Sequence, residues 1–376
     1  MSKANRSRIQ KLEELKRTKN IDAFLFTSPA SIKYFSGYFF YFEYGPSPFQ
    51  VIPAALLVFS ENDATLVIAD NEIDQLPALD PAVAIQPYGS YTFEQPLDYS
   101  RQCLLQIRDQ LKKRLTGRAR IGIEPNSMPL SIALSMTEHF QGIELVDISS
   151  EIAFLRAVKD EDELTHIRQA AALCDIGQHA VMQYASVGIT ELELFAMVRK
   201  EIEASAGMRV PIMADLASGP RTATGGGMPS NRRLAAGDLI LCDLTPCLGG
   251  YWGDCCNTVA IQHSTPSQKL SFALVKEALD IGIGAIRPGV QAKEVDRLMR
   301  AHIGHYTHHS GHGVGTQYHE EPRIVPYNAT ELAAGMVIAL EPAIYEKDYG
   351  VRLEHLIVVT ETGSEILTKF EPCFEQ

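Results

Sequence analysis

A short segment near the C-terminus, residues 308–321, reads HHSGHGVGTQYHEE and contains four histidines, three glycines and two glutamates. Imidazole and carboxylate groups at this density can bind a metal ion or transfer protons, although histidine clusters also occur on solvated loops. The segment therefore needs partners elsewhere in the chain before its role can be decided.

Two acidic residues in a predicted β-hairpin are the first such partners. The segment DLILCDLTPCLGGYWGDCCNTVAI contains two strand-like runs around Leu248, Gly249 and Gly250, which is typical of a tight turn. A turn centred between Leu248 and Gly249 would place Asp243 directly opposite Asp254. Directly opposed residues have Cβ atoms ~4.5–5.5 Å apart, where like charges destabilise a sheet. The pair therefore needs either solvent or a compensating charge.

A second predicted hairpin repeats this arrangement. In GMVIALEPAIYEKDYGVRLEHLIVVT, a turn centred between Lys347 and Asp348 would place Glu341 opposite Glu354, with apolar residues on either side. These acids follow those of the first pair by 98 and 100 residues. Either pair alone could face solvent, but two pairs at related positions favour a shared function.

Four carboxylates buried together would be very costly without compensation. Two of them could be protonated, as in a carboxylate dyad, or two divalent cations could balance all four. A cation site would also give the histidine-rich segment a role, since an imidazole can join carboxylates as a ligand. His312 is the candidate because its flanking glycines let the backbone pack closely. Such a ligand set suits manganese, with cobalt, zinc or iron as alternatives.

The elements that must position these residues fall into two parts. Residues 1–155 alternate strand-like runs with helical ones and predict an α/β domain without a glycine-rich phosphate loop. The strand-like runs are IDAFLFTS, AALLVF, ATLVIAD, RIGIEP and IELVDIS, and the helical one is LDYSRQCLLQIRDQLKKRL. Residues 156–376 begin with a long amphipathic helix, KDEDELTHIRQAAALCDIGQHAVMQYA, and contain every concentrated site signal. We expect the first domain to support or oligomerise the second.

The second domain also contains an internal repeat. Residues 185–202, ASVGITELELFAMVRKEI, align with residues 286–303, IRPGVQAKEVDRLMRAHI, so that Gly188 matches Gly289 at an offset of 101 residues. A glycine before an amphipathic helix is a common pattern, but each copy is followed by one of the acid-bearing hairpins. The repeat predicts a pseudo-two-fold domain with the acids near its axis.

These residues together resemble the ligand set of the pita-bread metallopeptidases, which include methionine aminopeptidase, prolidase, aminopeptidase P and creatinase. The matching residues are Asp243, Asp254, His312 in GHGVG, Glu341 in ALEPAIY and Glu354 in VRLEH. The closest likeness is to the Xaa-Pro peptidase branch and covers essentially the whole chain. It implies an α/β N-terminal domain of creatinase/prolidase type, followed by an α+β pita-bread catalytic domain with an internal pseudo-two-fold repeat.

The resemblance also implies roles for the ligands. Asp243 would bind one of two divalent metal ions, His312 and Glu341 would bind the other, and Asp254 and Glu354 would bridge them. Two ions that share a water lower its pKa enough to form a bridging hydroxide nucleophile near neutral pH. Glu341 would also act as general base on that water.

Further residues would handle the substrate. His319 would stabilise the oxyanion of the scissile carbonyl, His308 corresponds to an active-site histidine, and Arg352 corresponds to an arginine that supports the site. We expect the remaining histidines of this region, His305 and His309, to lie on a solvated loop.

One departure from the family pattern concerns substrate recognition. Xaa-Pro peptidases usually have a histidine seventeen residues before the first metal aspartate, and this chain has Gly226 there, within TATGGGMPSNRRL. The arginine that often follows the second aspartate is also absent, because this chain reads Cys256-Asn257-Thr258. We expect a gap in the substrate-facing wall at Gly226 and altered recognition.

The bulk composition restricts the partners and the compartment. The net charge of −12 over 376 residues argues against a nucleic-acid partner. No apolar run approaches the ~20 residues of a membrane helix, and the polar N-terminus lacks a secretory signal. Seven cysteines without a CxxC pair indicate reduced thiols, so we expect a cytoplasmic protein. We further expect a homodimer.

Three functional hypotheses follow. The first is a dinuclear-metal hydrolase that cleaves the Xaa-Pro bond of a dipeptide or short peptide. The second is a hydrolase or lyase of a small non-peptide metabolite, as in the creatinase and ectoine hydrolase relatives. The third is a catalytically silent binding module, which the complete ligand set argues against.

Overall fold

The computed structural model describes residues 3–39, 54–76, 79, 83–140 and 142–375. It divides into two compact units, Met1–Leu155 and Arg156–Gln376, each with its own core. None of the helices in the described part of the chain has both the length and the apolar character needed to cross a membrane.

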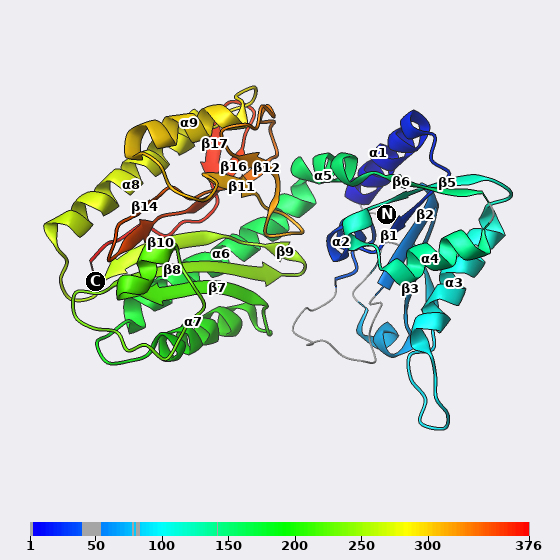
Figure 1. Cartoon of the computed structure of the whole chain (residues 1–376), viewed down its shortest axis with the longest axis horizontal. Coiled ribbons are helices and arrows are strands. Elements are labelled where there is room, and N and C mark those ends of the chain that lie inside the picture. Colours follow the sequence, from blue (N-terminus) through cyan, green and yellow to red (C-terminus); the bar gives the residue numbers. More distant parts are fainter. Residues whose placement is uncertain (1–2, 40–53, 77–78, 80–82, 141, 376) are drawn as a thin grey trace. The chain divides into compact units, whose positions relative to one another are not determined.

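The N-terminal unit is a six-stranded sheet in the order β4-β3-β2-β1-β5-β6, with helices on both faces (Figure 1). Strands β1, β5 and β6 run parallel, as do β3 and β4, whereas β2 is antiparallel to both of its neighbours. Its strands are β1 (Ala23–Phe26), β2 (Ala54–Ser60), β3 (Asp63–Ala69), β4 (Val83–Tyr88), β5 (Ala119–Ile123) and β6 (Ile143–Asp147). Its helices are α1 (Lys3–Lys19), α2 (Pro29–Ser36), α3 (Tyr99–Arg114), α4 (Leu130–His139) and α5 (Ser149–Ala157), with 3₁₀ turns η1 (Asp70–Gln75) and η2 (Pro125–Ser127).

Side-chain alternation along β1 explains the two helical layers. Phe24 and Phe26 pack into the apolar cluster on one face, and Ala23 and Leu25 pack into the cluster on the other. The five strands predicted from sequence are all present, and β4 was missed. Its sequence, VAIQPY, contains a proline and lies at the sheet edge, where the pattern of buried side chains is weak.

The C-terminal unit consists of two halves, each with two helices that pack on a β-sheet. The first half contains α6 (Glu161–Tyr184), α7 (Glu191–Ala206), β7 (Ile212–Ser218), η3 (Gly219–Thr224), β8 (Leu239–Leu248), β9 (Tyr251–Trp252) and β10 (Cys255–Ala260). The second contains α8 (Pro266–Ala285), α9 (Ala292–Ile303), β11 (Gly311–Gly313), β12 (Glu320–Ile324), β13 (Val337–Leu340), β14 (Ala343–Tyr345), β15 (Gly350–Arg352), β16 (His355–Val359) and β17 (Ser364–Ile366). The helices α6 and α7 pack on the β7–β8–β10 sheet, and α8 and α9 pack on the sheet that contains β13 and β16.

The internal repeat predicted from sequence is confirmed in backbone detail. Helix α7 begins at Glu191 and α9 at Ala292, which is the predicted offset of 101 residues. Before them, Gly188 and Gly289 both adopt positive φ, at 97° and 82°. Each glycine N–H donates a hydrogen bond to a leucine carbonyl ahead of the acid-bearing strands. The two copies are therefore equivalent connections and not a chance match.

The predicted register of the first hairpin is wrong by two residues. Asp243 pairs with Cys256 and not with Asp254, because the turn is formed by Gly249 and Gly250, both with positive φ (57° and 88°). A tight turn of this kind requires positive φ at both central residues, which glycine supplies at least cost. Because side chains two residues apart on one strand share a face, Asp243 and Asp254 still lie on the same side of the sheet.

The predicted register of the second hairpin is confirmed. Leu340 pairs with His355, and Ala343 pairs with Arg352, so the same register continues across the break between β13 and β14. Glu341 lies in that break, and Glu354 forms an isolated bridge with Cys256 of the first half. Cys256 is therefore flanked by Asp243 on one strand and Glu354 on the other, and it joins the two halves.

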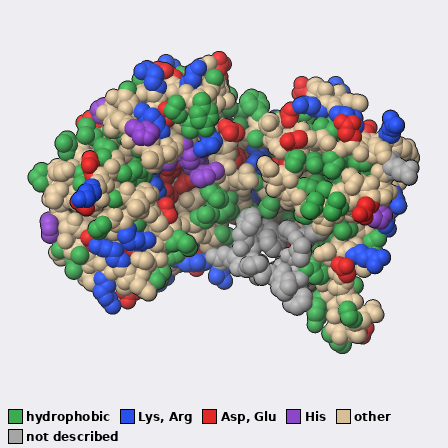
Figure 2. Space-filling model, viewed as in Figure 1, with side chains coloured by type: hydrophobic (Ala, Val, Ile, Leu, Met, Phe, Trp, Pro, Cys, Tyr) green, Lys and Arg blue, Asp and Glu red, His purple; other side chains and the backbone are tan. Residues whose placement is uncertain are grey.

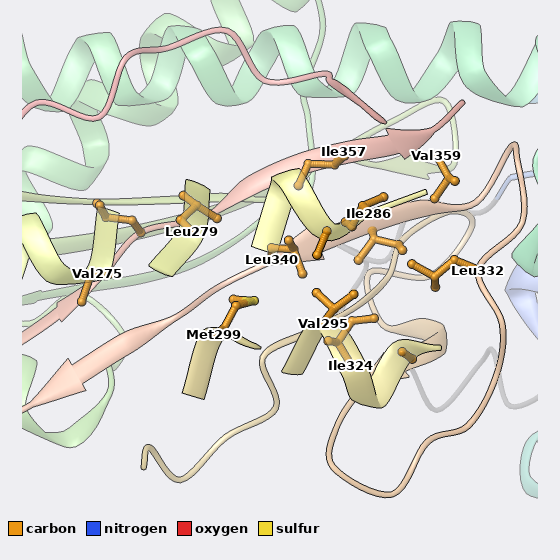
Figure 3. Close-up of a cluster of buried hydrophobic side chains, with 14 of the residues drawn as sticks. Val275, Leu279, Ile286, Val295, Met299, Ile324, Leu332, Leu340, Ile357 and Val359 are labelled. Atoms are coloured by element: carbon orange, nitrogen blue, oxygen red, sulfur yellow. The ribbon is translucent and has the colours of Figure 1, made fainter. Parts of the chain in front are cut away.

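The second half of the unit is built on an apolar core of aliphatic side chains (Figure 3). Leu279 from α8, Val295 and Met299 from α9, and Leu340 and Ile357 from β13 and β16 are all buried in one cluster. Packing of the helices against these strands holds β13 and β16 in place, and thus the acids at their ends.

A buried ionic cluster anchors the segment that carries His319. The Glu320 carboxylate accepts a hydrogen bond from Lys159 Nζ at 3.1 Å and lies 3.5 Å from Arg156 Nε, and all three side chains are almost fully buried. Thr316 Oγ1 and the Gln317 N–H also donate to it, both at 3.1 Å. These contacts attach residues 316–320 to residues 156–159 at the beginning of the unit.

Replacing Glu320→Gln should destabilise the C-terminal unit by about 3–5 kcal/mol, because two buried cations lose their shared carboxylate. The single tryptophan, Trp252, donates its backbone N–H to Gly315 O next to this cluster, so its fluorescence reports unfolding of this unit. Urea unfolding should show a lower midpoint. Glu321→Gln, at an exposed neighbouring position, is the control, and an equal midpoint for both variants would contradict the anchoring role.

Candidate functional site

The residues singled out in the sequence line one cavity of about 610 Å³ in the C-terminal unit. In Figure 2, acidic and histidine side chains gather in a hollow on the visible face of that unit. The structure brings together all eight predicted site residues: Asp243, Asp254, His308, His312, His319, Glu341, Arg352 and Glu354.

The two halves of the unit contribute symmetrically to this cavity. Asp243 comes from the middle of β8 and Asp254 from just before β10, whereas Glu341 and Glu354 come from the ends of β13 and β16. On β8, Ile240, Cys242 and Leu244 pack against α6 and α7, so the alternate Asp243 is directed to the other face.

His312 is held on β11 between two glycines that cannot be replaced without displacement. A Cβ at Gly311 would lie 2.2 Å from Ala339 O, and one at Gly313 would lie 2.3 Å from Glu321 O. The predicted reason for these glycines, close backbone packing at a crowded centre, is confirmed. The ring of His312 is buried, with Nδ1 3.0 Å from Gly313 O.

Nε2 of His312 faces the carboxylates. It lies 3.6 Å from Asp254 Oδ2 and 3.6 Å from Glu341 Oε1. One ligand atom each from Asp254, His312 and Glu354 lie within 4.8 Å of one another. This spacing is compact enough for the three groups to bind a common ion.

Burial shapes the protonation of the acids. Burial raises the pKa of Asp243 to about 6, despite the opposing charge of Arg352. Burial also raises the pKa values of Asp254 and Glu354, and the negative charges of Asp243 and Glu341 raise both further. Without a cation, Asp254 and Glu354 would keep their protons to a higher pH than free carboxyl groups do.

Glu341 differs from the other three acids because histidines surround it. Burial raises its pKa, but the hydrogen bond from His309 and the charges of His312 and Arg352 outweigh burial and bring the pKa to about 2. The donor is His309 Nε2, 2.8 Å from Glu341 Oε1. Glu341 is therefore ionised near neutral pH, the form in which a carboxylate binds a metal ion.

The prediction that His309 lies on a solvated loop is wrong. Its side chain is largely buried, lines the cavity and clusters with His312 and His319. No local pattern distinguished it from His305, which is exposed. The contact with Glu341 crosses from one segment of the chain to another and could not be predicted from spacing.

For His308, His312 and His319, burial lowers the pKa in each case, to about 4 for His312. These imidazoles are therefore neutral near pH 7, the form in which a ring nitrogen can bind a metal or donate a hydrogen bond.

Arg352 joins both halves at the cavity wall. Its Nη2 donates to Asp243 Oδ2 at 2.6 Å, and its Nη1 donates to Gly225 O and to Tyr345 Oη, the latter at 3.1 Å. The Tyr345 hydroxyl also hydrogen-bonds His308 Nε2 at 2.9 Å. Tyr345, which the sequence analysis did not single out, connects the arginine to the histidine.

Two features of the cavity itself favour divalent cations, without any appeal to the resemblance to a family. Among the described residues that line the cavity, Arg352 is the only lysine or arginine beside five carboxylates, the four predicted ligands and Asp215. Glu354 Oε2 is fully buried and has no hydrogen-bond partner among them. A buried carboxylate oxygen without a partner is costly, and oxygen donors with one imidazole suit hard or borderline divalent ions.

The comparisons with known proteins agree with this site. Residues 165–361 match the model of metallopeptidase family M24, and residues 8–158 match the creatinase/prolidase N-terminal domain. The Xaa-Pro dipeptidase of Pyrococcus furiosus is 28% identical over 97% of this chain and 99% of its own, and that of Pyrococcus horikoshii is 33% identical over 70% and 77%. The crystal structure of the X-Pro aminopeptidase from Thermotoga maritima is 26% identical, with a TM-score of 0.80 over 98% of this chain and 99% of that one.

These matches confirm the fold class expected from the sequence, an α/β N-terminal domain followed by a pita-bread catalytic domain. The M24 match alone spans the strands and segments that carry all eight cavity residues. The chain is a hydrolase that belongs to metallopeptidase family M24.

Proposed function

We propose that this protein cleaves the Xaa-Pro bond of dipeptides or short peptides. The observation that carries the proposal is a cavity with four largely buried acids, one buried imidazole and a carboxylate oxygen that no described residue satisfies. The similarity to proteins named Xaa-Pro dipeptidase and X-Pro aminopeptidase supports the choice of substrate.

In this proposal, two divalent ions are held by Asp243, Asp254, His312, Glu341 and Glu354. Bound ions of this kind polarise a scissile carbonyl and lower the pKa of water. We assign manganese first, because the donors are mainly carboxylate oxygens.

The protein's own groups then have separate tasks. Glu341, which is ionised, accepts the proton of the attacking water. His319, exposed to the cavity and neutral, donates a hydrogen bond to the developing oxyanion. Arg352 keeps Asp243 in place, and Tyr345 orients His308 toward the substrate.

A homodimer in the cytoplasm remains part of the proposal. The absence of disulfides among the described cysteines, six of them buried, is compatible with a reducing compartment.

The direct test is a hydrolysis screen of the metal-loaded protein against Xaa-Pro dipeptides, Xaa-Pro tripeptides and small amide metabolites. We expect cleavage of an Xaa-Pro bond. A preference for dipeptides over tripeptides would define a dipeptidase. Turnover confined to a non-peptide amide would refute the proposed substrate while leaving the metallohydrolase site in place.

Asp254→Asn should abolish binding of the metal pair, because it removes a carboxylate charge from the centre of the ligand set. Elemental analysis after metal loading should give about two ions per wild-type chain and clearly fewer for the variant. Asp348→Asn, at an exposed turn of the same unit, should bind metal like the wild type. Equal metal content in all three proteins would show that the ligand assignment is wrong.

His319→Ala should keep the metal content and lower kcat by ~10²–10³, the scale of one lost oxyanion donor. His305→Ala, at an exposed position outside the cavity, is the matched control and should have normal kinetics. Loss of metal from the His319 variant would make this residue a ligand, and unchanged kcat would remove it from the mechanism.

A further inference from the structure

An acid that the sequence analysis did not single out, Asp215, lies on the cavity wall beside the predicted ligands. It is on β7, directly opposite Asp243 of β8 in the antiparallel register. Directly opposed residues share a face of the sheet, and opposed like charges are destabilising. The facing acid pair of this sheet is thus Asp215 and Asp243.

The two nearby arginines do not fully neutralise this acid pair. Arg352 Nη2 donates to Asp243 Oδ2 at 2.6 Å but remains 3.6 Å from Asp215 Oδ2, beyond hydrogen-bond distance. The other arginine on this side, Arg221, pairs with Glu191 and donates to Met228 O. Among the described residues, no donor forms a hydrogen bond with the Asp215 carboxylate.

Gly226 makes room for this carboxylate. The expected gap in the wall at Gly226 does not exist, because a Cβ built there would lie 2.3 Å from Asp215 Oδ2. The glycine also has a φ of 135°, which other residues rarely adopt. An acid thus occupies the space beside this backbone, and a side chain at residue 226 would displace it.

The side chain of Asp215 is more exposed than those of the acids that we assign to the metals. Its side chain is 42% exposed, against 18% for Asp243, and Glu354 is almost fully buried. Apolar side chains also line the cavity, among them Met213, two residues from Asp215 on the same face of β7, and Met228. A carboxylate on an apolar wall suits a ligand with an aliphatic stem and a cationic end.

We propose that Asp215 is a specificity-determining residue that favours substrates whose first residue has a cationic side chain, lysine or arginine. This inference rests on the proposed Xaa-Pro cleavage. The substrate's ammonium or guanidinium group would add positive charge beside the opposed acid pair at the open side of the cavity.

The test compares Lys-Pro with norleucine-Pro, a neutral substrate of similar length, on wild type and Asp215→Asn. Wild type should have a higher kcat/KM for Lys-Pro, and the variant should lose that preference by about tenfold or more, the scale of one charged hydrogen bond. Norleucine-Pro turnover should be unchanged. The melting temperature should not fall, since the change removes one of two opposed like charges.

The remaining outcomes contradict the inference in distinguishable ways. If Asp215→Asn lowers kcat/KM equally for Lys-Pro and norleucine-Pro, Asp215 binds the α-ammonium group or positions Arg352. If wild type has equal kcat/KM for the two dipeptides, the cavity wall does not select a cationic side chain. Cleavage of neither dipeptide by metal-loaded wild type would overturn the proposed function itself. Asp348→Asn serves as the control for removal of an acid elsewhere in the unit.

Discussion

Four largely buried carboxylates and the more exposed Asp215 line one cavity, with Arg352 as the only arginine or lysine among its described lining residues. This concentration of negative charge is the constraint on which the C-terminal unit depends. Desolvation raises the pKa values of Asp243, Asp254 and Glu354, so these acids would be protonated or costly without cations. Divalent ions convert this cost into binding energy. These acids can therefore be ionised together only where positive charge is added, and the M24 family implies divalent metal ions.

The backbone around this centre is built to bring charges from distant segments together. The repeat supplies two acid-bearing hairpins, and Cys256 bridges them because it pairs with Asp243 and with Glu354. The glycines on either side of His312 allow β11 to approach its neighbours more closely than any side chain would permit. Buried aliphatic cores behind both sheets hold these strands rigid, which catalytic geometry requires.

The proposed substrate contact differs in its surroundings from the proposed metal ligands. The ligands are largely buried and come from the two repeat-related hairpins, whereas Asp215 comes from β7 and is 42% exposed at the cavity wall. A ligand set must keep its geometry for the chemistry to proceed. The charge at Asp215 can therefore change without removal of a proposed metal ligand.

The sequence by itself determined the metallopeptidase-like residue set, the internal repeat and the register of the second hairpin. Those features depend on spacing within short segments, and spacing is preserved in the fold. The register of the first hairpin follows from the local Gly249-Gly250 turn, which the sequence analysis placed one residue too early. Tertiary structure alone decided the close approach of Asp215 to the backbone of Gly226 and the contact of His309 with Glu341. These approaches depend on how strands and loops pack, which no local pattern of residues encodes.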